Sequence, residues 1–75
     1  MTKEQYFNQM PDELLCECIK ELTGQTKGNK SLNTVFDGVE NETDYFYSML
    51  DNIELEKDIL KEAAKRYLKI KMLQS

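Results

Sequence analysis

Apolar residues between Pro11 and Gly24 recur at the spacing of an amphipathic α-helix. At about 100° per residue they fall within an arc of about 140°, and most of the charged residues lie outside it. Pro11 suits the first position of this helix, and Gly24 suits its end. The members of the arc are Leu14, Leu15, Cys18, Ile19 and Leu22. The pattern therefore predicts one helix with one buried face.

A shorter helix is predicted before it. Thr2 and Gln5 have the spacing of a capping box, in which each side chain bonds the backbone of the other residue. This helix must end by Met10, because Pro11 disfavours a helical residue before it.

A third helix is predicted after a polar loop over residues 24–31. Ser31 is its expected cap, its apolar residues are Leu32, Val35 and Phe36, and its expected end is near Gly38. The alternative is an extended segment over residues 34–36, which is disfavoured because a lone strand has nothing to pair with.

Residues 43–73 predict one or two further helices. Thr43 or Asn41 can cap a helix that contains Tyr45, Phe46, Met49 and Leu50, with Tyr47 projecting away from the core. Asp51 and Glu54 resemble a second capping box and predict a break near residue 51, although one continuous helix from 43 to 73 stays an alternative. The core face expected for the last helix consists of Ile53, Ile59, Leu60, Ala63, Ala64, Tyr67 and Ile70.

These elements predict an all-α fold, a small compact bundle of four to five helices with a long C-terminal helix. The 75 residues, of which 40% are hydrophobic and 32% charged, suit a single helical domain over residues 1–75. No apolar run has the length of a signal peptide or a membrane span, and two cysteines two residues apart provide no disulfide framework. We therefore expect a cytoplasmic protein, and its composition suits a bacterial or phage genome.

The charges of the chain are segregated, although its net charge is only −4. Residues 37–58 contain eight acids and one base, whereas residues 59–75 contain five bases and one acid. Such a distribution bears on the choice of partner and on association rate rather than on fold.

Catalytic and metal-binding patterns do not emerge from the sequence. The chain has no histidine, which is the commonest general base and metal ligand. Cys16 and Cys18 would lie about 200° apart around a helix and could not grip one ion. The loop from Gly24 to Ser31 has the wrong glycine–lysine spacing for a phosphate-binding loop, and the acids that follow Asp37 do not match a calcium loop. We therefore expect a non-enzymatic protein without a cofactor or a metal ion.

Two features indicate protein binding. One is the segment of tyrosines and acids near residues 40–51, and the other is the last helix, whose apolar residues cover more than half of its circumference. The predicted partner-binding residues are Glu40, Glu42, Asp44, Tyr45, Tyr47, Asp51, Glu54, Leu68 and Met72.

The preferred hypothesis is a small acidic interaction module that regulates or inhibits a larger protein. A more specific form of this hypothesis is that the larger protein binds nucleic acid. One alternative is a partial nucleic-acid mimic that blocks such a protein. Another is a self-assembling homo-oligomer, such as a homodimer, in which the last helices pair in antiparallel fashion. Direct nucleic-acid binding by the lysines from Lys57 to Lys69 is disfavoured by the negative net charge.

Overall fold

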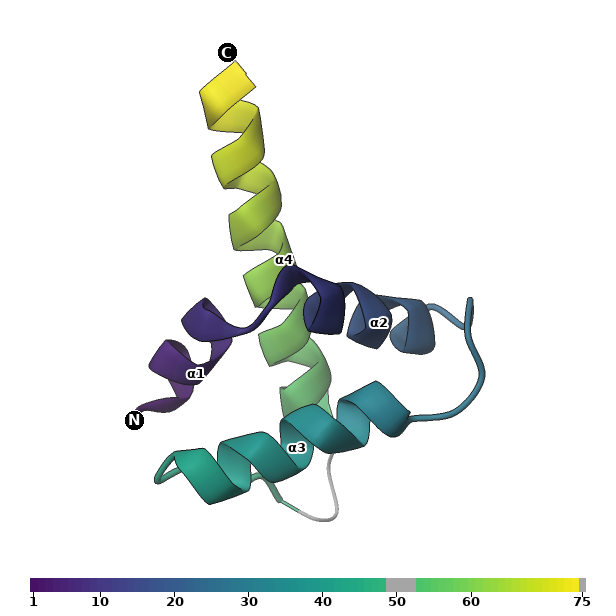
Figure 1. Cartoon of the computed structure of the whole chain (residues 1–75), viewed down its shortest axis with the longest axis vertical. Coiled ribbons are helices and arrows are strands. Elements are labelled where there is room, and N and C mark those ends of the chain that lie inside the picture. Colours follow the sequence, from purple (N-terminus) through teal and green to yellow (C-terminus); the bar gives the residue numbers. More distant parts are fainter. Residues whose placement is uncertain (49–52, 75) are drawn as a thin grey trace.

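The computed structural model describes residues 1–48 and 53–74, and within them the chain forms four helices and no strand. The all-helical fold with a long C-terminal helix is confirmed. Helices α1, α2 and α3 pack around the first half of α4, while the second half of α4 projects from this body (Figure 1). The helices are α1 (Lys3–Gln9), α2 (Asp12–Leu22), α3 (Lys30–Glu42) and α4 (Ile53–Gln74).

The first two helices follow the sequence prediction closely. In the capping box of α1, the Gln5 N–H donates to Thr2 Oγ1 over 3.1 Å, and the Thr2 N–H donates to Gln5 Oε1 over 2.9 Å. Pro11 precedes the first residue of α2 rather than occupying it. After α2 the chain turns at Gly24, whose φ of +78° lies in the left-handed region that favours glycine.

Helix α3 is longer than predicted, and the expected end near Gly38 is wrong. The helix continues through Gly38 to Glu42, and the extended alternative for residues 34–36 is also wrong. Gly38 serves close packing instead, because a Cβ at this position would lie 2.8 Å from Cζ of Tyr6 and nearer still to its hydroxyl oxygen. Val35 and Val39 are the fully buried residues of α3.

Residues 43–48 are not helical, so the predicted helix around Tyr45 and Phe46 is wrong, as is a continuous helix from 43 to 73. Thr43 ends α3, because its hydroxyl donates to the Val39 carbonyl and accepts from the Tyr45 N–H. The expectations for Met49, Leu50 and the Asp51 cap lie outside the described residues. The extended backbone also reverses the expected burial of two side chains. Tyr47, expected outside, is only 3% exposed, whereas Phe46, expected inside, is 70% exposed.

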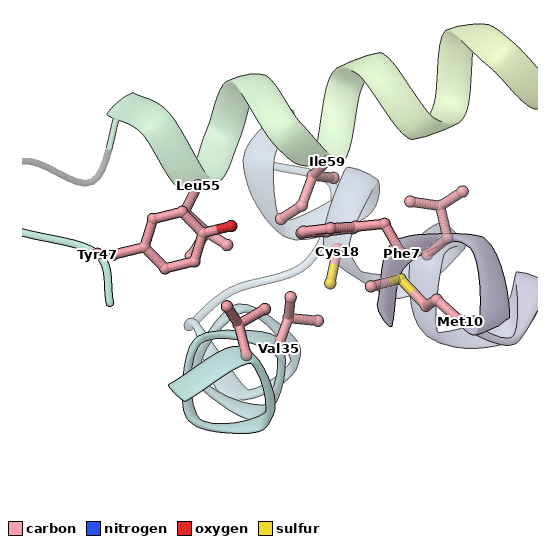
Figure 2. Packing of buried hydrophobic residues seen from close by; sticks show 9 residues of the cluster. Phe7, Met10, Cys18, Val35, Tyr47, Leu55 and Ile59 are labelled. Atoms are coloured by element: carbon pink, nitrogen blue, oxygen red, sulfur yellow. The ribbon is translucent and has the colours of Figure 1, made fainter. Parts of the chain in front are cut away.

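All four helices and Tyr47 contribute to one hydrophobic cluster (Figure 2). On α4 the core face consists of Leu55 and Ile59 with the polar Glu62 next in line. Ile59 is buried as predicted, but the predicted face is wrong by about a quarter turn, because four of the side chains expected inside are more than half exposed. These exposed residues are Ile53, Leu60, Tyr67 and Ile70.

Candidate functional site

The predicted aromatic–acidic group forms an internal network in the structure. The Tyr47 hydroxyl donates to Asp58 Oδ2 over 2.8 Å, and the Tyr45 hydroxyl donates to a carboxylate oxygen of Glu54. Lys3 Nζ lies 3.0 Å from Asp58 Oδ2, 3.5 Å from Glu54 Oε1 and 4.0 Å from the centre of the Tyr45 ring. This network links α1, residues 43–48 and the start of α4.

Burial determines the chemistry of this network. Desolvation, followed by the hydrogen bond to Asp58, raises the pKa of Tyr47 well above its ordinary value of 10.0. The Tyr47 ring stacks on Phe36 at a centroid distance of 5.8 Å and meets Tyr45 edge-on at 5.1 Å. The prediction that Tyr47 projects outward is therefore wrong, since its ring and hydroxyl stabilise the fold.

The other predicted acids lie around the end of α3. Glu40 is half-buried, whereas Glu42 and Asp44 are exposed. The main-chain carbonyl of Glu42 accepts a hydrogen bond of 3.2 Å from the amino group of Met1. Asp51 lies outside the described residues. The acidic surface that remains available to a partner is therefore smaller than the sequence suggests, because Glu54 is engaged with Lys3 and Tyr45.

The predicted residues Leu68 and Met72 lie on the projecting half of α4, at the other end of the molecule from the α3 terminus (Figure 1). Their exposed fractions are 59% and 74%. Five of the seven residues from 67 to 73 are apolar, and the other two are Lys69 and Lys71. A run of large exposed apolar side chains is the mark of an interaction surface rather than of an ordinary solvent-facing helix. We call residues 67–73 the α4 tip.

The base of the tip is fixed by a guanidinium. Arg66 Nη2 donates to the carbonyls of Phe7 and Met10 over 3.0 and 2.7 Å, and Nε donates to Glu62 Oε2 over 2.8 Å. A further bond of 2.6 Å runs from Nη1 to Asp12 Oδ1. Sequence analysis missed this contact, because a lysine- and arginine-rich helix end is typical of solvent-facing charge. The tip therefore leaves the body in a defined direction.

A groove of about 350 Å³ lies between α1 and α4, with Phe7 and Asn8 on one side and Lys61 and Lys65 on the other. The polar side chains that line this groove bond largely to one another. Lys65 Nζ donates to Asn8 Oδ1 over 2.9 Å, and Lys3 pairs with Asp58. Among residues 1–48 and 53–74, no three side chains of the metal-ligating types converge on one point. No helix in this part of the chain has the length and hydrophobicity of a membrane span.

Comparison of the chain with protein-family models, curated proteins and solved structures found no match.

Proposed function

We propose that this protein is a non-catalytic interaction module that regulates or inhibits a larger protein, and that the α4 tip is its binding element. The observation that carries the proposal is the exposure of five apolar side chains on a helix end that projects from the body. An amphipathic or apolar helix end inserting into a groove is a common mode of protein recognition.

The energetics favour the tip over the acidic residues. Burial of one large apolar side chain contributes about 1.5–3 kcal/mol, so Leu68 and Met72 together supply several kcal/mol of binding free energy. Arg66 fixes the direction of the tip before binding, which lowers the entropic cost of association. Lys69 and Lys71 flank the apolar side chains, so a groove with an acidic rim is the complementary surface.

The test is capture of a partner from host lysate treated with nuclease, with immobilised wild-type protein and with a variant that carries Leu68→Ser and Met72→Ser. We expect one stoichiometric partner that stays bound at high salt on the wild-type protein and is lost from the variant. Phe46→Ser is the matched control, because it removes an equally exposed apolar side chain from another part of the surface. A partner that the double variant still retains contradicts the proposal.

Partial nucleic-acid mimicry is the weaker alternative, because several acids are neutralised within the chain. Glu54 and Asp58 pair with Lys3, and Glu62 pairs with Arg66. A mimic would release its partner at moderate salt, whereas apolar docking persists. For location we propose the cytoplasm, where the exposed free thiol of Cys16 stays reduced.

A further inference from the structure

A second apolar surface runs along the outward side of α4. Residues 53, 57, 60, 64, 67 and 71 alternate at spacings of four and three, which is the seven-residue repeat of helices that pack side by side. We call these six residues the outer stripe. In order, they are Ile53, Lys57, Leu60, Ala64, Tyr67 and Lys71.

The outer stripe points away from the body of the protein. Its centre lies roughly 140° around α4 from the middle of Leu55 and Ile59, which fill the core. Ile53, Leu60 and Tyr67 are 57%, 51% and 59% exposed, and Ala64 is also exposed. The stripe extends over about 27 Å of helix, which is more than two seven-residue repeats.

We infer that the outer stripe packs against the outer stripe of a second copy of this chain, with the two α4 helices antiparallel. The lysines in the stripe determine the orientation. In a parallel pair, Lys57 and Lys71 would each lie beside the same residue of the other copy, and two like charges would meet at each place. In an antiparallel pair no lysine lies directly beside the same lysine of the other copy, and the nearest like charges, Lys57 and Lys71 of different copies, are offset by about one helical turn, ~6 Å along the axis.

The antiparallel register follows from the small residue of the stripe. When Leu60 of each copy lies opposite Ala64 of the other, the missing side-chain volume at Ala64 admits the leucine and lets the helices approach closely. Lys57 then lies opposite Tyr67 of the second copy, whose ring face attracts an ammonium group. Within one chain the Tyr67 ring already lies 5.7 Å from Lys71 Nζ.

The ends of the stripe are complementary in the same register. Lys71 lies opposite Ile53 of the second copy, one helical turn from Glu56 of that copy, so that its ammonium group reaches an exposed carboxylate. The acidic start of each α4 thereby meets the basic end of the other, and the segregated charges of the chain become attractive. This inference does not require the proposed function. The stripe shares Tyr67 and Lys71 with the α4 tip, whereas Leu68 and Met72, on which the test of the proposed function depends, lie off the stripe.

The first experiment is sedimentation equilibrium of the full chain from low to high micromolar concentration. We expect a dimer of twice 8.8 kDa. Leu60→Glu places a charge at the centre of both halves of a twofold interface and should weaken the dimer at least ~100-fold. Phe46→Glu is the matched control and should leave the dimer intact. Circular dichroism must show that both variants keep the wild-type helix content.

The second experiment tests the orientation by disulfide trapping in a Cys16→Ser background. An equimolar mixture of the Ile53→Cys and Lys71→Cys variants should give the mixed disulfide as the main product. The Lys57→Cys variant alone should form little covalent dimer, because antiparallel packing holds its two thiols ~15 Å apart along the helix axis. A monomer at every concentration, a dimer that survives Leu60→Glu, or efficient trapping of Lys57→Cys with itself overturns the inference. A monomeric protein that still captures a larger partner would leave the proposed function standing.

Discussion

Removal of the Arg66 guanidinium should destabilise the fold more than any other change to a charged side chain. Arg66→Met keeps the unbranched stem and removes all four hydrogen bonds of the guanidinium. Two of these bonds satisfy main-chain carbonyls, those of Phe7 and Met10, where the chain turns from α1 into α2. Another pairs with Glu62, whose side chain is only 7% exposed. The substitution therefore detaches the α1–α2 turn from α4.

The magnitude follows from the burial of each partner. The pair with Asp12 adds little, because the Asp12 side chain is 91% exposed. Each carbonyl that loses its donor costs about 1 kcal/mol. Breaking a fully buried pair costs ~3–5 kcal/mol, but Arg66 is 21% exposed and Lys65 still lies 3.5 Å from Glu62, so that contribution is reduced to about half. The sum is about 3.5–4.5 kcal/mol, a large fraction of the ~4–11 kcal/mol expected for a chain of this size.

The assay is urea and thermal unfolding followed by far-UV circular dichroism at one fixed protein concentration. We expect Arg66→Met to lower Tm by ~14–36 °C. Lys65→Met is the matched control, since that side chain is 63% exposed, and its effect should stay within about 0.5 kcal/mol. Adding Glu62→Met to Arg66→Met should recover part of the loss, because no carboxylate is then left buried. An Arg66→Met protein as stable as the wild type would refute this reasoning.

Three further predictions concern single sites. Gly38→Ala should lower stability by ~1–2 kcal/mol despite the better helix propensity of alanine, because the added Cβ meets the Tyr6 ring. In a Tyr6→Ala background the same substitution should raise stability, and thermal melts of the wild type, the two single variants and the double variant test both expectations. Desolvation raises the pKa of the Glu21 carboxyl, but its hydrogen bonds to the first N–H groups of α3 outweigh the desolvation, so the net shift is downward. Glu21 therefore contributes stability above its ordinary pKa of 4.5, and this stability is lost as the pH falls through the lower pKa of the folded state. Glu21→Gln should therefore flatten the decline in Tm between pH 6 and pH 3, and an unchanged slope contradicts the assignment. Burial, with the nearby acids, raises the pKa of the Cys18 thiol to about 11, so an alkylating reagent at pH 8 should modify only Cys16 until the protein unfolds, as read by mass spectrometry.

Local signals predicted the first half of the fold well. The capping box at Thr2, the apolar arc of α2 and the turn at Gly24 each depend on residues close together in the chain, and the structure confirms all three. Gly38 was misread because its role depends on Tyr6, which lies 32 positions earlier in the chain. A glycine that ends a helix and a glycine that admits a ring look the same in sequence.

The second half of the fold depends on polar residues that are buried. Thr43 is of a residue type that commonly begins a helix, but here it ends α3, because its hydroxyl donates to the carbonyl of Val39. On α4, Glu62 and Arg66 occupy the inward side, and Arg66 does so through contacts with residues more than 50 positions away, which no periodicity reports. Leu60 and Tyr67 were therefore assigned to the core. Their regular spacing is nevertheless visible in the sequence, and it identifies the outer stripe once the inward side is known.

Helices α1, α2 and α3 all pack around α4, the last helix of the chain, and this order affects how the protein folds during its synthesis. Helices α1, α2 and α3 each contact other parts of the chain, but the bonds that fix the α1–α2 turn come from Arg66, which the ribosome adds after all three. Until then Val35, Val39 and Cys18 lack the cover of Ile59 that they have in the finished core. The nascent chain therefore keeps these apolar side chains accessible and completes its core only after α4 has been translated.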